Sequence, residues 1–385
     1  MEFIIGKVVG FLIAVFVIGV IIFIHELGHF FFAKLAGCAV SQFSLGFGPR
    51  MFGFKRKETD YRVSWLPILG GYIKLMGMRD ETGDATEEEI ADAGKYGLKS
   101  YEEISTWRKL SILVGGVFTQ CLVCVLVLTL VIIFMGRPIN SVMIVEPLAG
   151  SPAFKAGLQE GDKILSIDNN NIISIRQMIE LVSANKGEPM RVIVNRSGQE
   201  FVLEMTPEFN SKQNRVMIGV SLQDAPGFSR EGMGIIDYLT GGLVWTYNMT
   251  VMMVQMIWML ITGQVSLENL MGPVGMIRVT AAVARTGFLN LIQLFAMINM
   301  NLALINLLPI PAVDGGHVLM LLCEKIARRR IPDKAKNVIN YAGIGFLLIL
   351  MFLITFGDIL KWREGVFKKF DKMVEDAQTP KPESA

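Results

Sequence analysis

Apolar residues gather into five long runs along this chain, separated by stretches in which polar and apolar positions are mixed. The runs cover residues 3–35, 110–135, 238–261, 289–308 and 338–360. Each is long enough to cross a bilayer as a helix, which takes about 20 mostly apolar residues. The first run is too long for a signal peptide and has no small-residue cleavage site, so we expect a retained helix.

The stretch between the second and third runs has the composition of a soluble α/β domain. Ser151-Pro152 opens one predicted helix, and residues 174–184 form another. Short segments of strand composition cover residues 142–145, 162–167, 190–194, 200–205 and 215–222. These elements predict a small barrel-like or sandwich module. Because no catalytic constellation occurs in it, we expect a binding module.

Residues 38–107, between the first and second runs, have a mixed pattern. Residues 44–49 are rich in turn formers, and residues 61–75 have strand composition broken by Pro67 and by Gly70-Gly71. This pattern predicts a β-hairpin or a bent strand.

Composition supports a membrane protein. The chain has 385 residues, of which 52% are hydrophobic and 9% aromatic, and its mean hydropathy is +0.46. These values indicate an integral membrane protein with room for one soluble domain. The net charge of +2 argues against a nucleic-acid partner. No cysteine falls between residues 125 and 322, so the soluble domain has no disulfide.

The first apolar run carries the chemistry, in the motif His25-Glu26-x-x-His29. Residues i and i+4 share a helix face, so the two imidazoles can hold one metal ion. Glu26 lies about 100° further round the helix, close enough to take a proton from a water at that metal. The alternative is a buried His/Glu hydrogen-bonding cluster that joins helices. Ionisable groups at membrane depth are costly and usually functional, which favours the metal site.

Zinc in a catalytic site takes a third protein ligand and keeps one position open. Asp314 is the best candidate, because it follows the broken segment that contains Pro309 and Pro311 and precedes two glycines. A carboxylate on broken backbone at the edge of a membrane helix is costly unless it binds a cation. The alternatives are that Asp314 caps the helix that starts at Gly315, or that His317 is the ligand.

Topology constrains this third ligand. The two histidines lie near the C-terminal end of their run, and Asp314 lies just past the end of run 289–308. They can share a metal only if both runs cross in the same direction. We therefore expect run 238–261 to be interfacial or re-entrant, which leaves four spans. This choice also keeps the basic residues 34, 55–57, 108–109, 325 and 328–330 on one side, as the positive-inside rule requires.

These motifs resemble those of the site-2 protease family of intramembrane zinc metalloproteases (peptidase family M50), in its bacterial RseP/RasP-type branch. His25-Glu26-x-x-His29 matches the active-site helix of the family. Asn306-x-x-Pro309-x-Pro311-x-x-Asp314-Gly315 matches the second motif, whose aspartate is the third zinc ligand. Weaker similarities cover a membrane-associated β-region, a bacterial PDZ signature and a family-like turn, at residues 43–49 with 67–72, 151–164 and 272–275.

The resemblance implies a polytopic α-helical membrane protein with four transmembrane helices, an inserted α/β PDZ domain and a membrane-associated β-hairpin region. The expected N-terminal membrane region is 1–137 and the PDZ domain 138–223. Interfacial or linker helices follow at 224–284, and the C-terminal membrane region is 285–385.

The resemblance also implies the activity: an intramembrane zinc endopeptidase with one catalytic Zn²⁺, held by His25, His29 and Asp314, and with Glu26 as the base. Its expected substrates are single-pass membrane proteins, such as anti-sigma factors or signal-peptide remnants, trimmed beforehand by another protease. The expected location is a bacterial cytoplasmic membrane, with the active site near the cytoplasmic face and the PDZ domain outside.

Substrate contacts are expected at two places. An unwound substrate segment can pair with the bent strand, and Asn306 can bind its freed backbone groups. The candidate residues near the active site are Asn306, Pro309, Pro311, Gly70, Gly71 and Tyr72. In the PDZ domain, the expected groove lies between the strand that holds Ile218, Gly219 and Val220 and the helix that begins near Ser174. This groove acts either as a receptor for substrate or as a size filter.

Three departures from the family pattern are visible. Asp314 follows valine where leucine is usual, Gln120 stands where an asparagine is typical, and only one PDZ-like module fits. Two other functions compete with proteolysis. A scaffold with a structural metal would not need Glu26, and a metal transporter would not need a peptide-binding module.

Overall fold

The computed structural model describes residues 2–77, 91, 93–172, 175–185, 187–196, 199–210, 215–230, 232–266 and 271–363. The C-terminal tail beyond residue 363, part of the expected C-terminal region, and Ser174 lie outside these residues. The chain forms two compact units. The first comprises Met1–Val131 with Thr240–Ala385, and the second comprises Ile132–Leu239.

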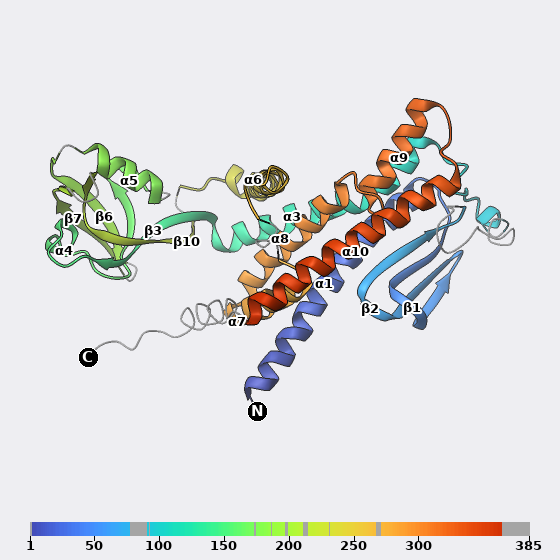
Figure 1. Cartoon of the computed structure of the whole chain (residues 1–385), viewed down its shortest axis with the longest axis horizontal. Coiled ribbons are helices and arrows are strands. Elements are labelled where there is room, and N and C mark those ends of the chain that lie inside the picture. The colour runs from blue at the N-terminus through green and yellow to red at the C-terminus, as the bar shows by residue number, and fades with distance from the viewer. Residues whose placement is uncertain are drawn as a thin grey trace. The chain divides into compact units, whose positions relative to one another are not determined.

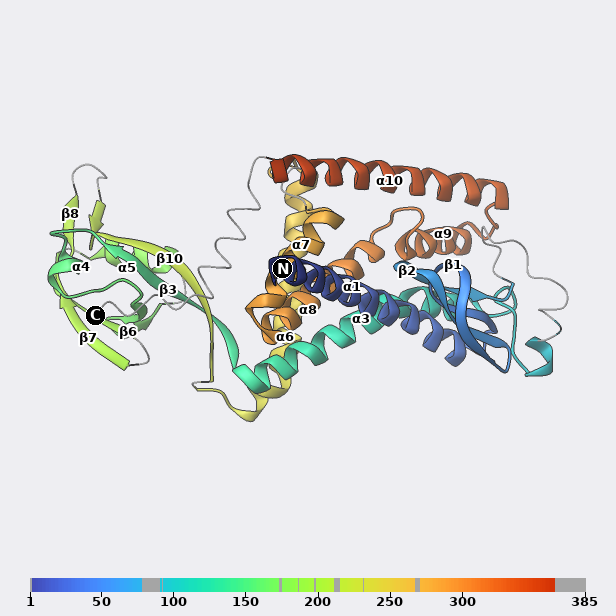
Figure 2. The ribbon, with the colours of Figure 1, turned by 90° about the horizontal axis from the view of Figure 1, so that it is seen from below.

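Long helices build the first unit (Figures 1 and 2). Five helices of the described chain are long and apolar enough to cross a membrane, and they coincide with the five apolar runs. They are α1 (Glu2–Leu35), α3 (Thr106–Met135), α6 (Ile235–Ile261), α8 (Phe288–Leu307) and α10 (Asp333–Arg363). Two shorter helices accompany them, α7 (Pro273–Thr286) and α9 (Asp314–Ala327).

Glycines allow α1 and α3 to touch. A Cβ atom on Gly28 would lie 2.4 Å from the carbonyl oxygen of Gly115, and one on Gly115 would lie 2.7 Å from the ring of Phe32. Helices in a membrane gain little from the hydrophobic effect and associate through close backbone packing at small residues. This contact is the reason that α3 comes so near to the histidines of α1.

The direction of the helices bears on the predicted topology. In both views α1 and α8 lead to the same end of the unit, where α9 and the strands β1 and β2 lie, whereas α6 runs across the direction of α1 and α8 (Figures 1 and 2). Length and composition alone would let α6 cross a membrane. A parallel α1 and α8 favours the interfacial or re-entrant alternative for α6, and the number of crossings stays a prediction.

The predicted hairpin is formed by β1 (Val40–Arg56) and β2 (Thr59–Leu75), which pair with each other through several register shifts. One face lies on α1, where Phe43 packs edge-on against Phe23 and Phe30 at centroid distances of 5.7 and 5.3 Å. Large apolar side chains also point outward, including Phe54 (63% exposed) and Trp65 (67% exposed). Exposed aromatic side chains on a hairpin fit a membrane-associated element.

The second unit is built on a twisted sheet. Within the described residues its strands are ordered β10-β3-β4-β6-β7, and β5 pairs with β4. Their bounds are β3 (Arg137–Pro147), β4 (Lys163–Ile167), β5 (Asn170–Asn171), β6 (Met190–Arg196), β7 (Gln199–Met205) and β10 (Val220–Ser229). Two helices, α4 (Pro152–Lys155) and α5 (Ile175–Ala184), and the paired strands β8 (Glu208–Asn210) and β9 (Arg215–Met217) complete it.

A single apolar core joins this sheet to its helices. Val142, Ile144 and Ile164 from the sheet are fully buried, and Met178 of α5 is 1% exposed in the same cluster. The prediction of one strand over residues 215–222 is wrong, because Gly219 adopts a positive φ of 74° and separates β9 from β10. Strand β10 continues to Ser229, where it pairs with Arg137 of β3.

Candidate metal centre

His25 and His29 lie one turn apart on α1, and both are buried, at 8% and 7% exposure. Their Nε2 atoms are 3.1 Å apart, as the i, i+4 spacing predicts. A Cβ atom on Gly116 would lie 2.5 Å from Nε2 of His29. The backbone of α3 therefore closes one side of the histidine pair, and position 116 has no room for a side chain between α3 and the two imidazoles.

Broken backbone positions Asp314. Helix α8 ends at Leu307, and Ala312 adopts a φ of 75°, a left-handed conformation that costs energy for a residue with a Cβ atom. Helix α9 then begins at Asp314 itself. A Cβ atom on Gly315 would lie 2.2 Å from the carbonyl oxygen of Leu308. The prolines stop α8, and the glycine lets α9 start close against the preceding loop.

Three ligand atoms converge at this point. Asp314 Oδ2 lies 3.1 Å from His25 Nε2 and 3.2 Å from His29 Nε2. The edges of a tetrahedral zinc site with bonds of about 2.0–2.2 Å measure roughly 3.3–3.6 Å. Three lone pairs directed at one another in a buried site repel unless a cation lies between them. The donor set and its spacing therefore fit a zinc ion.

The other ring nitrogens of both histidines contact α3. Nδ1 of His29 lies 2.8 Å from the carbonyl oxygen of Ile112, and Nδ1 of His25 lies 3.1 Å from Oε1 of Gln120. Contacts of this kind orient metal-binding imidazoles in proteins. The sequence marked position 120 as unusual but did not predict this contact, because the contact depends on how closely α3 approaches α1.

Glu26 is half-buried beside His25 and faces the hairpin. A Cβ atom on Gly71 would lie 3.1 Å from Cγ of Glu26 and 2.9 Å from the carbonyl oxygen of Ser44. The glycine therefore brings the β2 backbone against the candidate base without a side chain between them.

The remaining predicted residues divide into two groups. Asn306 reaches the centre, with Nδ2 3.2 Å from Nε2 of His25. Tyr72 instead donates to Oε1 of Gln42 at 3.2 Å and stacks on Phe47. Gly70 has a φ of 137°. Pro309 lies in the loop between α8 and α9, and the carbonyl oxygen of Pro311 lies 2.4 Å from where a Cβ atom on Gly343 of α10 would be.

His317, the alternative third ligand, is not in the cluster. Among the described residues, the His, Cys, Asp and Glu side chains that come close enough to share a metal ion are those of His25, His29 and Asp314. Burial lowers the pKa of His317 despite the nearby carboxylate of Asp314. The imidazole of His317 is therefore neutral at neutral pH.

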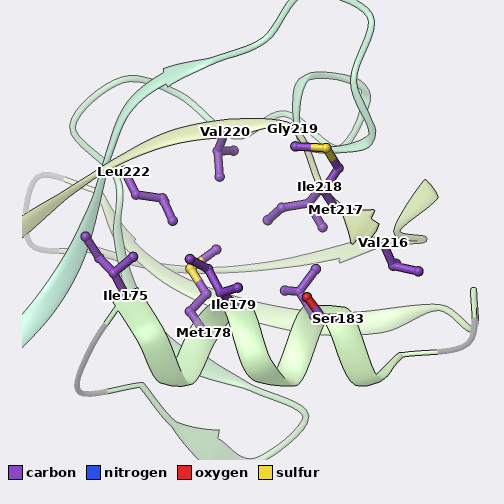
Figure 3. A pocket seen from close by; sticks show the side chains of 11 residues that line it. Ile175, Met178, Ile179, Ser183, Val216, Met217, Ile218, Gly219, Val220 and Leu222 are labelled. Carbon is purple, nitrogen blue, oxygen red and sulfur yellow. The ribbon is translucent and has the colours of Figure 1, made fainter. Parts of the chain in front are cut away.

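The second unit has a groove in the predicted place (Figure 3). Ile218, Gly219 and Val220 line one wall, and Met178 and Ile179 of α5 line the other, around a cavity of about 210 Å³. In the described part of the chain, β10 is the last strand of its sheet, with β3 on one side and this groove on the other. An extended peptide can add to such an edge.

The chain is similar to known proteins over most of its length. The model of "Peptidase family M50" matches residues 13–350. The chain is 28% identical to "Regulator of sigma-W protease RasP" of Bacillus subtilis, over 92% of this chain and 98% of the relative. It is 27% identical to "Zinc metalloprotease RasP" of Geobacillus kaustophilus, over 90% and 96% of the two chains.

A solved structure is similar to the second unit. The PDZ domain of the SdrC-like protein of Listeria monocytogenes is 22% identical, covers 21% of this chain and 85% of its own length, and gives a TM-score of 0.20.

Proposed function

The chain belongs to peptidase family M50, and we propose that this multi-pass zinc metalloprotease hydrolyses peptide bonds within the transmembrane segments of single-pass membrane proteins. One observation carries the proposal. The convergence of His25, His29 and Asp314 within 3.2 Å lies on and beside helices that are apolar enough to span a bilayer. A peptide bond reaches such a centre only if it lies within or beside the membrane.

His25, His29 and Asp314 would hold one zinc ion. Bound there, zinc supplies a Lewis acid that polarises a peptide carbonyl and lowers the pKa of a water molecule toward neutrality. Glu26 is adjacent to His25 in the chain, and its Cγ lies 3.1 Å from where a Cβ atom on Gly71 would be. It accepts the proton of the attacking water and delivers it to the departing amine.

A helical substrate must unwind before hydrolysis, because helical hydrogen bonds occupy its carbonyl groups. Residues 71–75 pair with residues 40–45 of β1, and Gly71 contacts Glu26. A substrate segment that adds to this strand would pass directly by the base. Asn306 has an amide beside His25 and binds one of the freed backbone groups.

The substrates we propose are anti-sigma factors or signal-peptide remnants, trimmed beforehand by another protease. The name of the Bacillus relative, a regulator of sigma-W protease, supports this class. The basic residues near the ends of the spans support an active site toward the cytoplasm and a PDZ domain that faces outward. Its apolar groove is suited to an extended peptide end.

The test is cleavage of a single-span model substrate by the purified, zinc-loaded protein in proteoliposomes. Glu26→Gln at equal zinc content should lower the rate about 10²–10⁴-fold, the usual contribution of a general base. Equal activity of the variant would reveal a contaminating protease. Glu160→Gln, which changes an exposed carboxylate in the second unit, is the matched control and should cleave normally.

A further inference from the structure

Gln120 is an amide buried completely within α3 (0% exposed), with Oε1 3.1 Å from Nδ1 of His25. We propose that Gln120 is a positioning residue of the metal centre. Its amide oxygen accepts the Nδ1–H of His25 and thereby keeps Nε2 unprotonated and directed at the point shared with His29 and Asp314. The inference rests on the proposed function, since it assumes that this point holds zinc.

The tautomer of His25 follows from the geometry. A neutral imidazole carries one N–H, and Nε2 of His25 is the nitrogen that lies 3.1 Å from both His29 Nε2 and Asp314 Oδ2. A nitrogen that binds a metal cannot carry the hydrogen, so the hydrogen sits on Nδ1. A buried N–H needs an acceptor, and Oε1 of Gln120 is in place. The reverse orientation of the amide would set one donor against another.

The surroundings of Gln120 fix its position. Asn299 of α8, itself fully buried, donates from Nδ2 to the backbone oxygen of Gln120 at 2.8 Å. The amide nitrogen Nε2 of Gln120 has no hydrogen-bond partner among the described residues. Burying that unpaired group costs folding free energy. The cost indicates that glutamine is kept at this position for the contact of its oxygen with His25.

The length of the side chain decides the contact. An asparagine at position 120 is shorter by one C–C bond of about 1.5 Å, so its oxygen would stop roughly 4.5 Å from His25. The helices cannot close this gap, because Gly28 already touches the backbone of Gly115. In this chain a glutamine side chain has the length that reaches His25, whereas the asparagine that is typical of the family at this position would be too short.

The experiment measures zinc affinity of the full chain in detergent by competition with a chelator, with zinc alone and no substrate. Gln120→Leu and Gln120→Asn should each weaken zinc binding by about 10–100-fold, the usual effect of losing an outer partner of a histidine ligand. Gln120→Glu retains the acceptor and should stay within about threefold of the native affinity. Gln255→Leu, which removes an exposed amide from α6, is the matched control and should change nothing.

The outcomes separate this inference from the proposed function. Native zinc affinity in Gln120→Leu, or equal losses in Gln120→Glu and Gln120→Leu, would overturn the positioning role. His25→Ala should abolish stoichiometric binding, and retention of zinc in that variant would overturn the proposed site itself. If Gln120→Leu fails to fold, the comparison of Gln120→Glu with Gln120→Asn decides the question.

Discussion

The metal centre and the groove of the PDZ domain are built in opposite ways. The centre is a set of polar atoms within 3.2 Å of one another, held by helices that touch at glycines. The groove is a backbone edge beside apolar side chains. A metal site depends on the position of each ligand atom, and removing one ligand atom abolishes its function. An apolar groove loses binding free energy only in proportion to the apolar area that is removed.

The largest effect should follow from removing one ligand atom from the centre. Asp314→Ala takes away one of three ligands and should reduce zinc content from one ion to near zero, with cleavage at background. Zinc content by atomic emission and cleavage of the model substrate measure both losses. His317→Ala is the control, since His317 lies outside the cluster. If the Asp314→Ala variant keeps its zinc and its native activity, another residue must be the third ligand.

The second prediction changes the helix contact and leaves the ligands intact. Gly28→Ala would force a Cβ atom to within 2.4 Å of the backbone oxygen of Gly115, whereas a Cβ atom on Gly19 of the same helix meets nothing within 4 Å. We expect Gly28→Ala to lower the free energy of unfolding by about 1–3 kcal/mol, a typical cost of overpacking. Zinc affinity should fall with it, because α3 orients both histidines.

Gly19→Ala is the matched control in α1 and should leave thermal unfolding and zinc affinity near the native values. Equal behaviour of the two alanine variants would mean that α1 and α3 tolerate a wider separation. Close contact between the two helices would then be unnecessary for the metal centre, as it is for the groove.

A third prediction concerns the link between α1 and the hairpin. Glu58 is 5% exposed and pairs with Lys34, which also donates to Thr59 at 2.9 Å. Burial is the largest single influence and would raise the pKa of Glu58, but the hydrogen bond and the charge of Lys34, together with hydrogen bonds from the backbone and Thr59, outweigh it, and the pKa lies below the ordinary value of 4.5. A lowered pKa stabilises the fold above that value, and the stabilisation is lost as the pH falls through the folded-state pKa.

Hydrogen exchange can measure this link. Glu58→Gln should reduce the protection factors of amides in residues 40–75 at neutral pH, and the difference from the native protein should shrink as the pH falls below 4.5. Glu200→Gln, an exposed residue of β7, provides the control. A pH-independent difference would show that packing of the side chain, and not its charge, holds the hairpin on α1.

The same contrast explains what could be predicted from the sequence. Spacing placed His25 and His29 on one helix face, and prolines with glycines marked Asp314, because these signals are local. The predicted family is confirmed by the match to peptidase family M50. The five apolar runs coincide with five helices that are long and apolar enough to span a membrane. The break between β9 and β10 follows from the positive φ of Gly219, which strand composition does not reveal, whereas the contact of Gln120 depends on how far α3 lies from α1. Periodicity carries no information about such distances.

The smallest effect should come from the groove. Ile179 is 37% exposed on the wall opposite Val220, and Ile179→Glu places a carboxylate against an apolar surface. We expect binding of a peptide with an apolar C-terminus to weaken roughly tenfold, or about 1.4 kcal/mol. Fluorescence anisotropy with the full-length protein measures this change. Phe209→Glu, which alters an exposed residue of β8 outside the groove lining, should bind as the native protein does.

Cleavage in the Ile179→Glu variant then separates a receptor from a filter. A substrate reduced to its transmembrane segment should be cut at the native rate, because it never engages the groove. A substrate that carries an apolar extracytoplasmic end should be cut several-fold more slowly if the groove recruits it, and at an unchanged rate if the domain only excludes bulk. Equal slowing of both substrates would mean that the groove and the metal centre act as one site, and the contrast between the two regions would fail.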